Sequence, residues 1–222
     1  MKIITWNIQW GRGADGKVDL GRIVAHAKRL ADFDVLCLQE IFSGYPELPG
    51  CDGSDQFKSL AELLPEYTAI AGVATDTPHP DGSRRSFGNM IFSRLPVLQV
   101  FRHLLPWPAD PGVTSMQRIA LEATLETSFG LVRVTTTHLG YYSAAQRLAQ
   151  IDGLRMLHAS AHGHRVKPAR ADLSNGPFHW QPRPAAGIVC GDCNCEPGSP
   201  GHARMLERFD DGTPAFRDAW DL

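Results

Sequence analysis

The chain has 222 residues, of which 43% are hydrophobic and 21% are charged, which is typical of a globular protein with a sizeable core. Its formal net charge of −2 makes extended nucleic acid a possible but not a favoured partner, because proteins that bind many phosphates usually carry a basic excess. No apolar run is long enough to span a bilayer, no signal peptide begins the chain, and five cysteines do not suggest a disulfide framework, so a cytoplasmic protein is favoured.

Apolar spacing predicts that strands and helices alternate in the first half of the chain. Runs of β-branched and aromatic residues predict strands, and apolar residues three and four positions apart predict helices. In chain order, the predicted elements are strand 2–7, helix 19–33, strand 34–40, helix 54–64 and strand 67–73. The segment 75–86 is rich in Pro, Gly and Asp and is predicted to be a loop.

The second half of the chain is predicted to be richer in strands. The predicted strands are 88–93, 97–104, 118–126, 131–139 and 187–191, and the predicted helices are 143–159 and 201–209. Ser143 is a suitable N-cap for the longer helix. Residues 160–186 follow neither period and hold four prolines and three histidines, which indicates a functional loop or a mobile insertion. Since no repeat or linker interrupts the chain, residues 1–222 are predicted to form a single layered α/β domain.

Polar side chains stand where several predicted strands end. They are Asn7, Glu40, His138, Asp192 and Asn194. Each has an ordinary structural explanation when taken alone, as a turn-forming amide, a solvated carboxylate or a hydrogen-bonded imidazole. Ligand sites in layered α/β folds gather at strand ends, and oxygen-bearing side chains suit a hard cation. The set therefore predicts a Mg²⁺ site, with Mn²⁺ as an alternative.

Three cysteines crowd the same segment, GIVCGDCNCEP, and raise the alternative of a thiolate metal site. A zinc site on Cys190, Cys193 and Cys195 would need a fourth ligand. The candidates in the preceding segment are His162, His164 and His179. The spacing C-x₂-C-x-C is not a familiar zinc motif, so structural thiols are favoured over a metal site, with Cys195 as the thiol expected to be exposed.

The motifs ITWNIQW, DVLCLQE, FGNMIFSRLPV, LVRVTTTHLGYY and GIVCGDCNCEP, taken in this order, resemble those of the endonuclease/exonuclease/phosphatase superfamily of metal-dependent phosphoesterases. The resemblance runs from residue 3 to about residue 220. It implies a four-layer α/β sandwich in which two central mixed β-sheets are flanked by helices.

The resemblance also implies a role for each strand-end residue. Glu40 would bind Mg²⁺ directly, with Asn7 beside the metal, where it positions the phosphate or Glu40. Asp192 would lie at the same metal centre and orient or deprotonate the attacking water, and Asn194 would hold a phosphate oxygen. His138 resembles the histidine that donates to the scissile phosphate in the deoxyribonuclease and sphingomyelinase branches, whereas AP endonucleases carry a different residue there.

The substrate is predicted less directly. Asn89 resembles a phosphate-pocket residue, and the loop with Arg84 and Arg85 and the 160–186 segment with Trp180 are candidates to line the substrate cleft. His138 and the small net charge favour a small-molecule or lipid-headgroup phosphodiester, and a nuclease acting on DNA or RNA is the alternative.

The end of the chain adds a third hypothesis. In the family, a further strand carries a Ser-Asp-His-like motif with a catalytic histidine, and FRDAWDL resembles the segment shortly before it, which makes Asp218 a structural residue. A C-terminal strand is therefore expected to be missing here. Either the chain is incomplete or it is a non-catalytic binding protein that lacks the terminal histidine.

Overall fold

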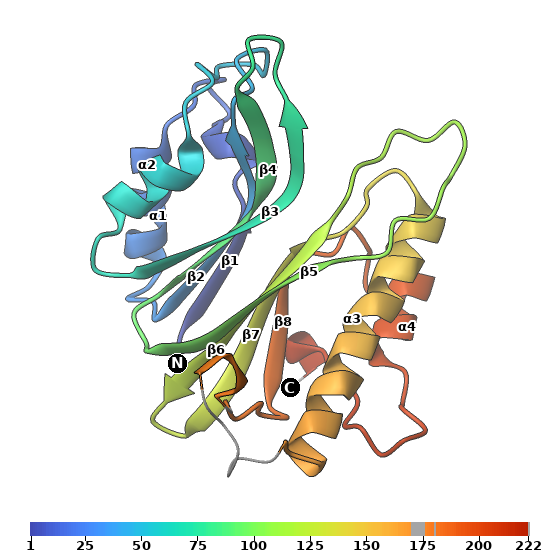
Figure 1. Cartoon of the computed structure of the whole chain (residues 1–222). Coiled ribbons are helices and arrows are strands. Elements are labelled where there is room, and N and C mark those ends of the chain that lie inside the picture. Colours follow the sequence, from blue (N-terminus) through green and yellow to red (C-terminus); the bar gives the residue numbers. More distant parts are fainter. Residues whose placement is uncertain (170–175, 180, 222) are drawn as a thin grey trace.

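Two four-stranded β-sheets stack face to face, with helices on the outer face of each (Figure 1). The computed structural model describes residues 1–169, 176–179 and 181–221. The strands are β1 (Ile3–Asn7), β2 (Val35–Ser43), β3 (Thr68–Pro78), β4 (Arg84–Ser93), β5 (Val97–Leu104), β6 (Ile119–Thr127), β7 (Gly130–His138) and β8 (Gly187–Asp192). The α-helices are α1 (Leu20–Leu30), α2 (Gln56–Leu63), α3 (Ala144–Val166) and α4 (Pro200–Leu206), and short 3-10 turns cover Gln9–Gly11, Gly176–Phe178 and Ala219–Asp221. The predicted four-layer α/β sandwich is confirmed.

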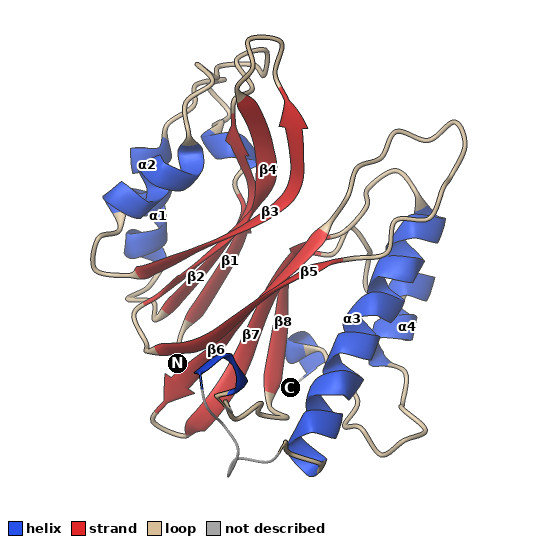
Figure 2. Cartoon of the chain, in the orientation of Figure 1, coloured by secondary structure: helices blue, strands red, loops and turns tan. Residues whose placement is uncertain are grey.

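Both sheets are mixed, as predicted. The first has the strand order β1-β2-β4-β3, and the second has the order β5-β6-β7-β8. One pair in each sheet is parallel, β1 with β2 and β7 with β8, and the other pairs are antiparallel. A parallel pair needs a crossover connection, which α1 supplies for the first sheet and α3 for the second. These crossovers place the helices on opposite outer faces of the sandwich (Figure 2).

The strand β2 explains how the layers are held together. Val35 and Cys37 pack between the two sheets, whereas Leu36 and Leu38 pack under α1 and α2, and all four are fully buried. A strand buried on both faces reads as a continuous apolar run, which is why DVLCLQE shows no alternation. Gln39 follows the same alternation and donates from Nε2 to Thr136 Oγ1 of the second sheet at 2.8 Å.

Two predicted boundaries were wrong. The expected loop 75–86 is a β-hairpin whose strands pair as far as Pro78 and Arg84, so that only a short turn remains, closed by a hydrogen bond from His79 N to Ser83 O of 2.9 Å. Cross-strand pairing outweighs the turn-forming composition of this stretch. The helix capped by Ser143, whose Oγ accepts from Gln146 N at 3.0 Å, continues to Val166 instead of ending near 159.

That longer helix shortens the aperiodic segment predicted for 160–186. The predicted cleft residue Trp180 lies outside the described residues. None of the helices in the described ranges is both long enough and apolar enough to cross a bilayer.

His158 of α3 anchors both the second sheet and the chain that follows α4. Its Nδ1 lies 3.0 Å from Arg133 Nη2, and its Nε2 lies 2.9 Å from the carbonyl oxygen of Pro214. Since a guanidinium can only donate, Nδ1 accepts and the proton is on Nε2. Burial lowers the pKa of His158, and the positive charge of Arg133 adds to this effect.

We expect acid to destabilise the fold through His158. The unfolded chain takes up this proton once the pH falls below about 6.5, and the folded chain resists it, so the free energy of unfolding falls until the pH reaches the lower folded-state pKa. His158→Gln should be less stable than wild type near pH 8 and lose less stability on acidification. Urea unfolding at several pH values measures how the free energy of unfolding of each protein changes with pH. His26→Gln, on the exposed face of α1, is the control. Equal slopes in all three proteins would contradict the prediction.

Candidate active site

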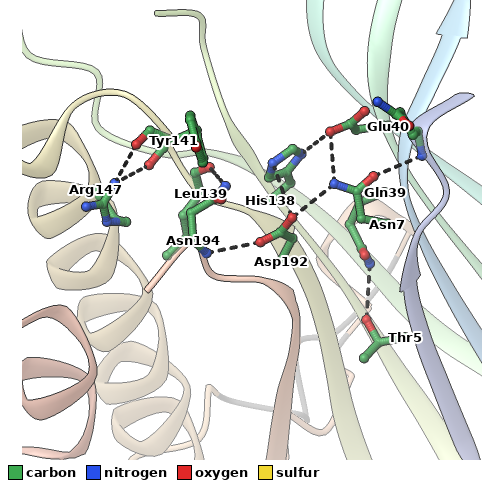
Figure 3. A network of polar contacts seen from close by, with 12 residues as sticks. Thr5, Asn7, Gln39, Glu40, His138, Leu139, Tyr141, Arg147, Asp192 and Asn194 are labelled. Atoms are coloured by element: carbon green, nitrogen blue, oxygen red, sulfur yellow. Dashed lines mark hydrogen bonds and ion pairs between the residues drawn. The ribbon is translucent and has the colours of Figure 1, made fainter. Parts of the chain in front are cut away.

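Strand register brings polar side chains from both sheets to one end of the sandwich. In the first sheet Asn7 is aligned with Gln39, which precedes Glu40. In the second sheet His138 is aligned with Asp192. Figure 3 shows Asn7, Glu40, His138 and Asp192 turned toward one another, so four strands that are far apart in sequence contribute to a single group.

Glu40 reaches this group because β2 is bulged at its position. Gln39 and Ile41 pair with the consecutive residues Asn89 and Gly88 of β4, which leaves Glu40 as the extra residue. Its φ of +61° is in the left-handed region, which costs a non-glycine residue on the order of 1–3 kcal/mol. The strand continues to Ser43, so the prediction that Glu40 ends it was wrong. The bulge, instead of a strand end, turns the carboxylate out of the regular alternation.

The amide of Asn7 bridges the two carboxylates. Its Nδ2 donates to Glu40 Oε1 at 2.9 Å and to Asp192 Oδ2 at 3.0 Å, while its Oδ1 accepts from Gln9 N at 3.0 Å. The backbone hydrogen bond from Gln9 fixes which end of the amide faces the carboxylates. Asn7 thus ties β1 to both acids, and its predicted contact with a metal stays a prediction.

His138 lies against both acids without a hydrogen bond to either. Its Nδ1 is 3.8 Å from Glu40 Oε1, and its Nε2 is 3.8 Å from Asp192 Oδ2. Nδ1 is buried and has no hydrogen-bond partner among the described residues. Burial, together with the positive charge of Arg118, lowers the pKa of His138 to about 4. The imidazole is therefore neutral at pH 7 and has one N–H to donate.

The backbone around Asp192 is fixed on both sides. Gly191 has a φ of +136°, and a Cβ there would lie 1.9 Å from the carbonyl oxygen of Thr137, so only glycine fits at this position. Asn194, with a φ of +48°, donates from its backbone N to Asp192 Oδ1 at 3.1 Å and from Nδ2 to the carbonyl oxygen of Leu139 at 2.9 Å. These bonds fasten the end of β8 to the end of β7.

Asn7 and Asp192 of this group line a solvent-accessible hollow of about 730 Å³, together with Trp6, Tyr141 and Asn194. A second hollow of about 750 Å³ shares Tyr141 and Asn194 with the first and extends over Tyr142 and Arg147. Arg147 holds the Tyr141 loop by donating from Nη1 to the carbonyl oxygens of Gly140 and Tyr141, at 2.7 and 2.9 Å (Figure 3). Tyr141 and Tyr142 are 65% and 68% exposed.

The three predicted substrate residues lie outside this group. Asn89 is buried in β4 and donates from Nδ2 to the carbonyl oxygen of Ile119 at 3.4 Å, whereas its Oδ1 has no partner in the described ranges. Arg84 and Arg85 begin β4 at the hairpin end, where they pair with Asp76 and Glu47 at 2.8 and 2.6 Å. Their predicted roles at the substrate are not tested by these contacts.

The three cysteines of GDCNCEP do not form one cluster. Cys190 packs between the two sheets, whereas Cys193 packs on the opposite face of the second sheet, with residues of α3. The thiol of Cys195 hydrogen-bonds that of Cys193, which lowers the pKa of Cys195 to about 6. All five thiols are free. Since Cys190 and Cys193 lie on opposite faces, the zinc alternative, which needed all three sulfurs at one ion, is wrong.

Sequence reasoning missed two residues near the site. Gln39, next to Glu40, is 1% exposed. Its Nε2 links the two sheets through Thr136 Oγ1 and also donates to Thr5 Oγ1 at 3.2 Å (Figure 3). Arg118 precedes β6 and is 7% exposed. A signal for it was available, because β6 is antiparallel to β7 and therefore begins where β7 delivers His138.

Comparison with known families matches the Endonuclease/Exonuclease/phosphatase family over residues 4–221. The chain belongs to this family. Members of the endonuclease/exonuclease/phosphatase family are hydrolases that act on phosphate esters, and they generally use divalent metals. No curated protein matches the sequence.

Solved structures of endonuclease/exonuclease/phosphatase proteins share the fold. One from Beutenbergia cavernae is 27% identical, with a TM-score of 0.60, over 92% of this chain and 51% of that chain. The Bacteroides thetaiotaomicron mannosyl-6-phosphatase is 17% identical, with a TM-score of 0.59, over 92% and 69%. D. rerio TDP2 complexed with single-strand DNA product is 21% identical, with a TM-score of 0.52, over 91% and 62%. This chain thus spans about half the length of the first.

The side chains of this group have the oxygen ligands that suit a hard divalent cation. Glu40 and Asp192 both accept from the amide of Asn7, and Asp192 also accepts from Asn194 N, but neither carboxylate has a salt bridge to Lys or Arg among the described residues. Burial raises the pKa of Glu40, and the neighbouring Asp192 charge acts in the same direction. Within the described residues no group of three or more His, Cys, Asp or Glu side chains could by itself hold a metal ion. Mg²⁺ characteristically takes one or two carboxylates and completes its shell with water and substrate oxygens.

Proposed function

We propose that this chain hydrolyses a phosphodiester of a small molecule or a lipid headgroup in a reaction that depends on Mg²⁺ or Mn²⁺. The observation that carries the proposal is the bridge from Asn7 to both carboxylates, with His138 3.8 Å from each of them. Two acids, an amide donor and a neutral imidazole in one group, of which Asn7 and Asp192 line an open hollow, match the needs of phosphoryl transfer, in which charge must be neutralised and water must be aligned.

Each residue has a distinct proposed role. Glu40 and Asp192 would hold the cation, which when bound neutralises charge that develops on the phosphate oxygens. Asp192 would also accept a proton from the attacking water, whose oxygen bonds to phosphorus as the ester P–O bond breaks. Asn7 keeps the two carboxylates in register. His138 would donate its N–H to a non-bridging oxygen, and Asn194 would hold the Asp192 loop beside the substrate.

A nuclease is the second candidate, and one observation favours it. The exposed rings of Tyr141 and Tyr142 border the hollow next to the site, and their centroids are 4.9 Å apart. Exposed aromatic rings beside a phosphate site suit the stacking of nucleic-acid bases. The net charge of −2 weighs against this candidate, because phosphate backbones are bound chiefly by basic residues.

The test is to compare hydrolysis of bis(p-nitrophenyl) phosphate with nicking of plasmid DNA and cleavage of abasic DNA, in Mg²⁺ and in chelator. We expect release of nitrophenol in Mg²⁺, none in chelator, and no DNA cleavage. Glu40→Gln protein purified in the same way controls for contaminating phosphoesterases. DNA cleavage without ester hydrolysis would support the nuclease, and no turnover on any substrate would support a non-catalytic binding protein.

A further inference from the structure

Cys193 and Cys195 form a pair of neighbouring thiols that the proposed mechanism does not use. Both are free, and the S–H of Cys193 donates to the sulfur of Cys195. Cys193 packs against the apolar cluster between α3 and the second sheet, whereas Cys195 is half-buried and lines both hollows beside the candidate active site. A small solute in either hollow can therefore reach Cys195, which has a second thiol in contact with it.

The surroundings of Cys195 favour its ionised form. The hydrogen bond from Cys193 lowers the pKa of Cys195 to about 6, while burial opposes this effect. The positive charges of a protonated His202 and of Arg147 also lower the pKa, and so does a hydrogen bond with Ser199. The thiolate, not the thiol, is the nucleophile in cysteine chemistry, and reactive cysteines are partly exposed beside cationic groups. Cys195 meets both conditions.

The other cysteines have the surroundings of unreactive thiols. Cys37 is fully buried between the two sheets, where it hydrogen-bonds to Cys190. Cys51 lines a separate hollow of about 310 Å³, but burial raises its pKa and the negative charge of Asp52 acts in the same direction. Of the five cysteines, all of which the structure describes, Cys195 alone combines access from a hollow with neighbours that stabilise a thiolate.

The residue between the two thiols belongs to the candidate active site. Asn194 donates from its backbone N to Asp192 Oδ1 at 3.1 Å and from Nδ2 to the carbonyl oxygen of Leu139 at 2.9 Å (Figure 3). A disulfide requires two sulfurs about 2 Å apart, which is closer than a hydrogen bond between thiols brings them. A bond from Cys193 to Cys195 would therefore tighten the turn and move Asn194.

We propose that a peroxide oxidises Cys195 and that Cys193 then closes a disulfide with it, which displaces Asn194 and slows hydrolysis at the neighbouring site. The thiol chemistry goes beyond the proposed function and does not depend on it. Only the effect on hydrolysis rests on the proposed function.

Two steps account for the electrons and the atoms. In the first, the sulfur of Cys195 attacks one oxygen of the peroxide, so that an S–O bond forms, the O–O bond breaks and hydroxide leaves. The sulfur is oxidised to a sulfenic acid, and the peroxide is reduced. In the second, the sulfur of Cys193 attacks the sulfenic sulfur, so that the S–S bond forms, the S–O bond breaks and the Cys193 proton leaves with the hydroxyl as water.

Hydrogen peroxide is the probe, and mass spectrometry of tryptic peptides is the readout. Cys193 and Cys195 lie on the same tryptic peptide, which ends at Arg204. After treatment at pH 7 this peptide should be lighter by two hydrogen atoms, and dithiothreitol should reverse the change. Cys195 should react at least about 10-fold faster than Cys51, because an ordinary thiol is only a few per cent ionised at this pH.

Substitutions assign the two steps. In Cys193→Ala, which keeps an apolar side chain under α3, the sulfenic acid of Cys195 should accumulate and be trapped by dimedone. Cys195→Ser should form neither the disulfide nor the trapped acid, and the control Cys51→Ser should behave like wild type. A cooperative thermal melt of each reduced variant shows that it is folded. The proposal is overturned by an unchanged peptide in wild type, by dimedone labelling of the same peptide in Cys195→Ser, or by a cross-link of Cys37 to Cys190 instead.

Hydrolysis is scored separately from the thiol chemistry. Oxidised wild type should hydrolyse the chromogenic diester at least about 10-fold more slowly than reduced wild type, because a displacement of about 1 Å can cost about 100-fold in rate. The rate of Cys195→Ser should not respond to peroxide. Equal rates in oxidised and reduced wild type would overturn the effect on the site. A disulfide that forms in a chain without turnover on any ester would contradict the proposed function and leave the thiol pair intact.

Discussion

Glu40→Gln should lower metal-dependent hydrolysis of the chromogenic diester by at least about 100-fold while the protein stays folded. The substitution removes the charge that would hold the cation but keeps an oxygen that can accept from Asn7 Nδ2, now 2.9 Å from Glu40 Oε1. Burial raises the pKa of Glu40, so the charged carboxylate is less favourable in the folded protein than in water. A neutral amide at this position should therefore leave the melting temperature in chelator unchanged or slightly higher.

Three measurements decide the result for Glu40. We compare three quantities with wild type: the hydrolysis rate in Mg²⁺, the melting temperature in chelator, and the rise in melting temperature on adding Mg²⁺. Glu40→Gln should keep the melting temperature in chelator and lose both the rate and the Mg²⁺-induced rise. Glu62→Gln, on the exposed side of α2 and 3.9 Å from Lys58, is the matched control that changes the same side chain away from the site. An unfolded variant, combined with wild-type turnover in chelator, would rule out the metal role.

Much of this site follows from chain order and strand ends. Asn7, His138 and Asp192 are the last residues of β1, β7 and β8, and the sequence placed each at the end of an apolar or β-branched run. Parallel pairing then aligns such ends within a sheet, as it does for His138 and Asp192. The alternation of helices and strands in both halves suggested two packed sheets, but the meeting of these particular strand ends was implied only by the family resemblance, because it depends on contacts between distant strands.

The rest depends on backbone detail that residue patterns do not encode. Glu40 was expected at a strand end, but it is the extra residue of a bulge, with a φ of +61°, between Gln39 and Ile41, which pair with Asn89 and Gly88. Arg118 lies at the beginning of its strand, where a search for residues that follow apolar runs does not reach. Its burial beside the site, with Nε and Nη1 left without a partner in the described ranges, is visible only in the folded structure.

Asp192→Asn should lower the rate of diester hydrolysis by at least about 100-fold, since it removes both a proposed cation ligand and the proposed proton acceptor. Unlike the change at Glu40, it should also disturb the site. Asp192 Oδ2 accepts from Asn7 Nδ2 at 3.0 Å and Oδ1 accepts from Asn194 N at 3.1 Å, so both oxygens are in use. An asparagine can satisfy only one of these donors, and its own amide nitrogen would then face the other.

The two substitutions therefore separate charge from geometry. Asp192→Asn should melt below wild type, at a cost of about 1 kcal/mol for one unsatisfied hydrogen bond, whereas Glu40→Gln should not. Calorimetric melting in chelator measures this difference without any contribution from a cation. Asp210→Asn, an exposed position after α4, controls for the loss of one negative charge.

Because both acids share the amide of Asn7, the double variant should lose less activity than the two single losses combined, as expected for residues that act as one unit. Strictly additive losses would mean that the two carboxylates do not serve a common ion.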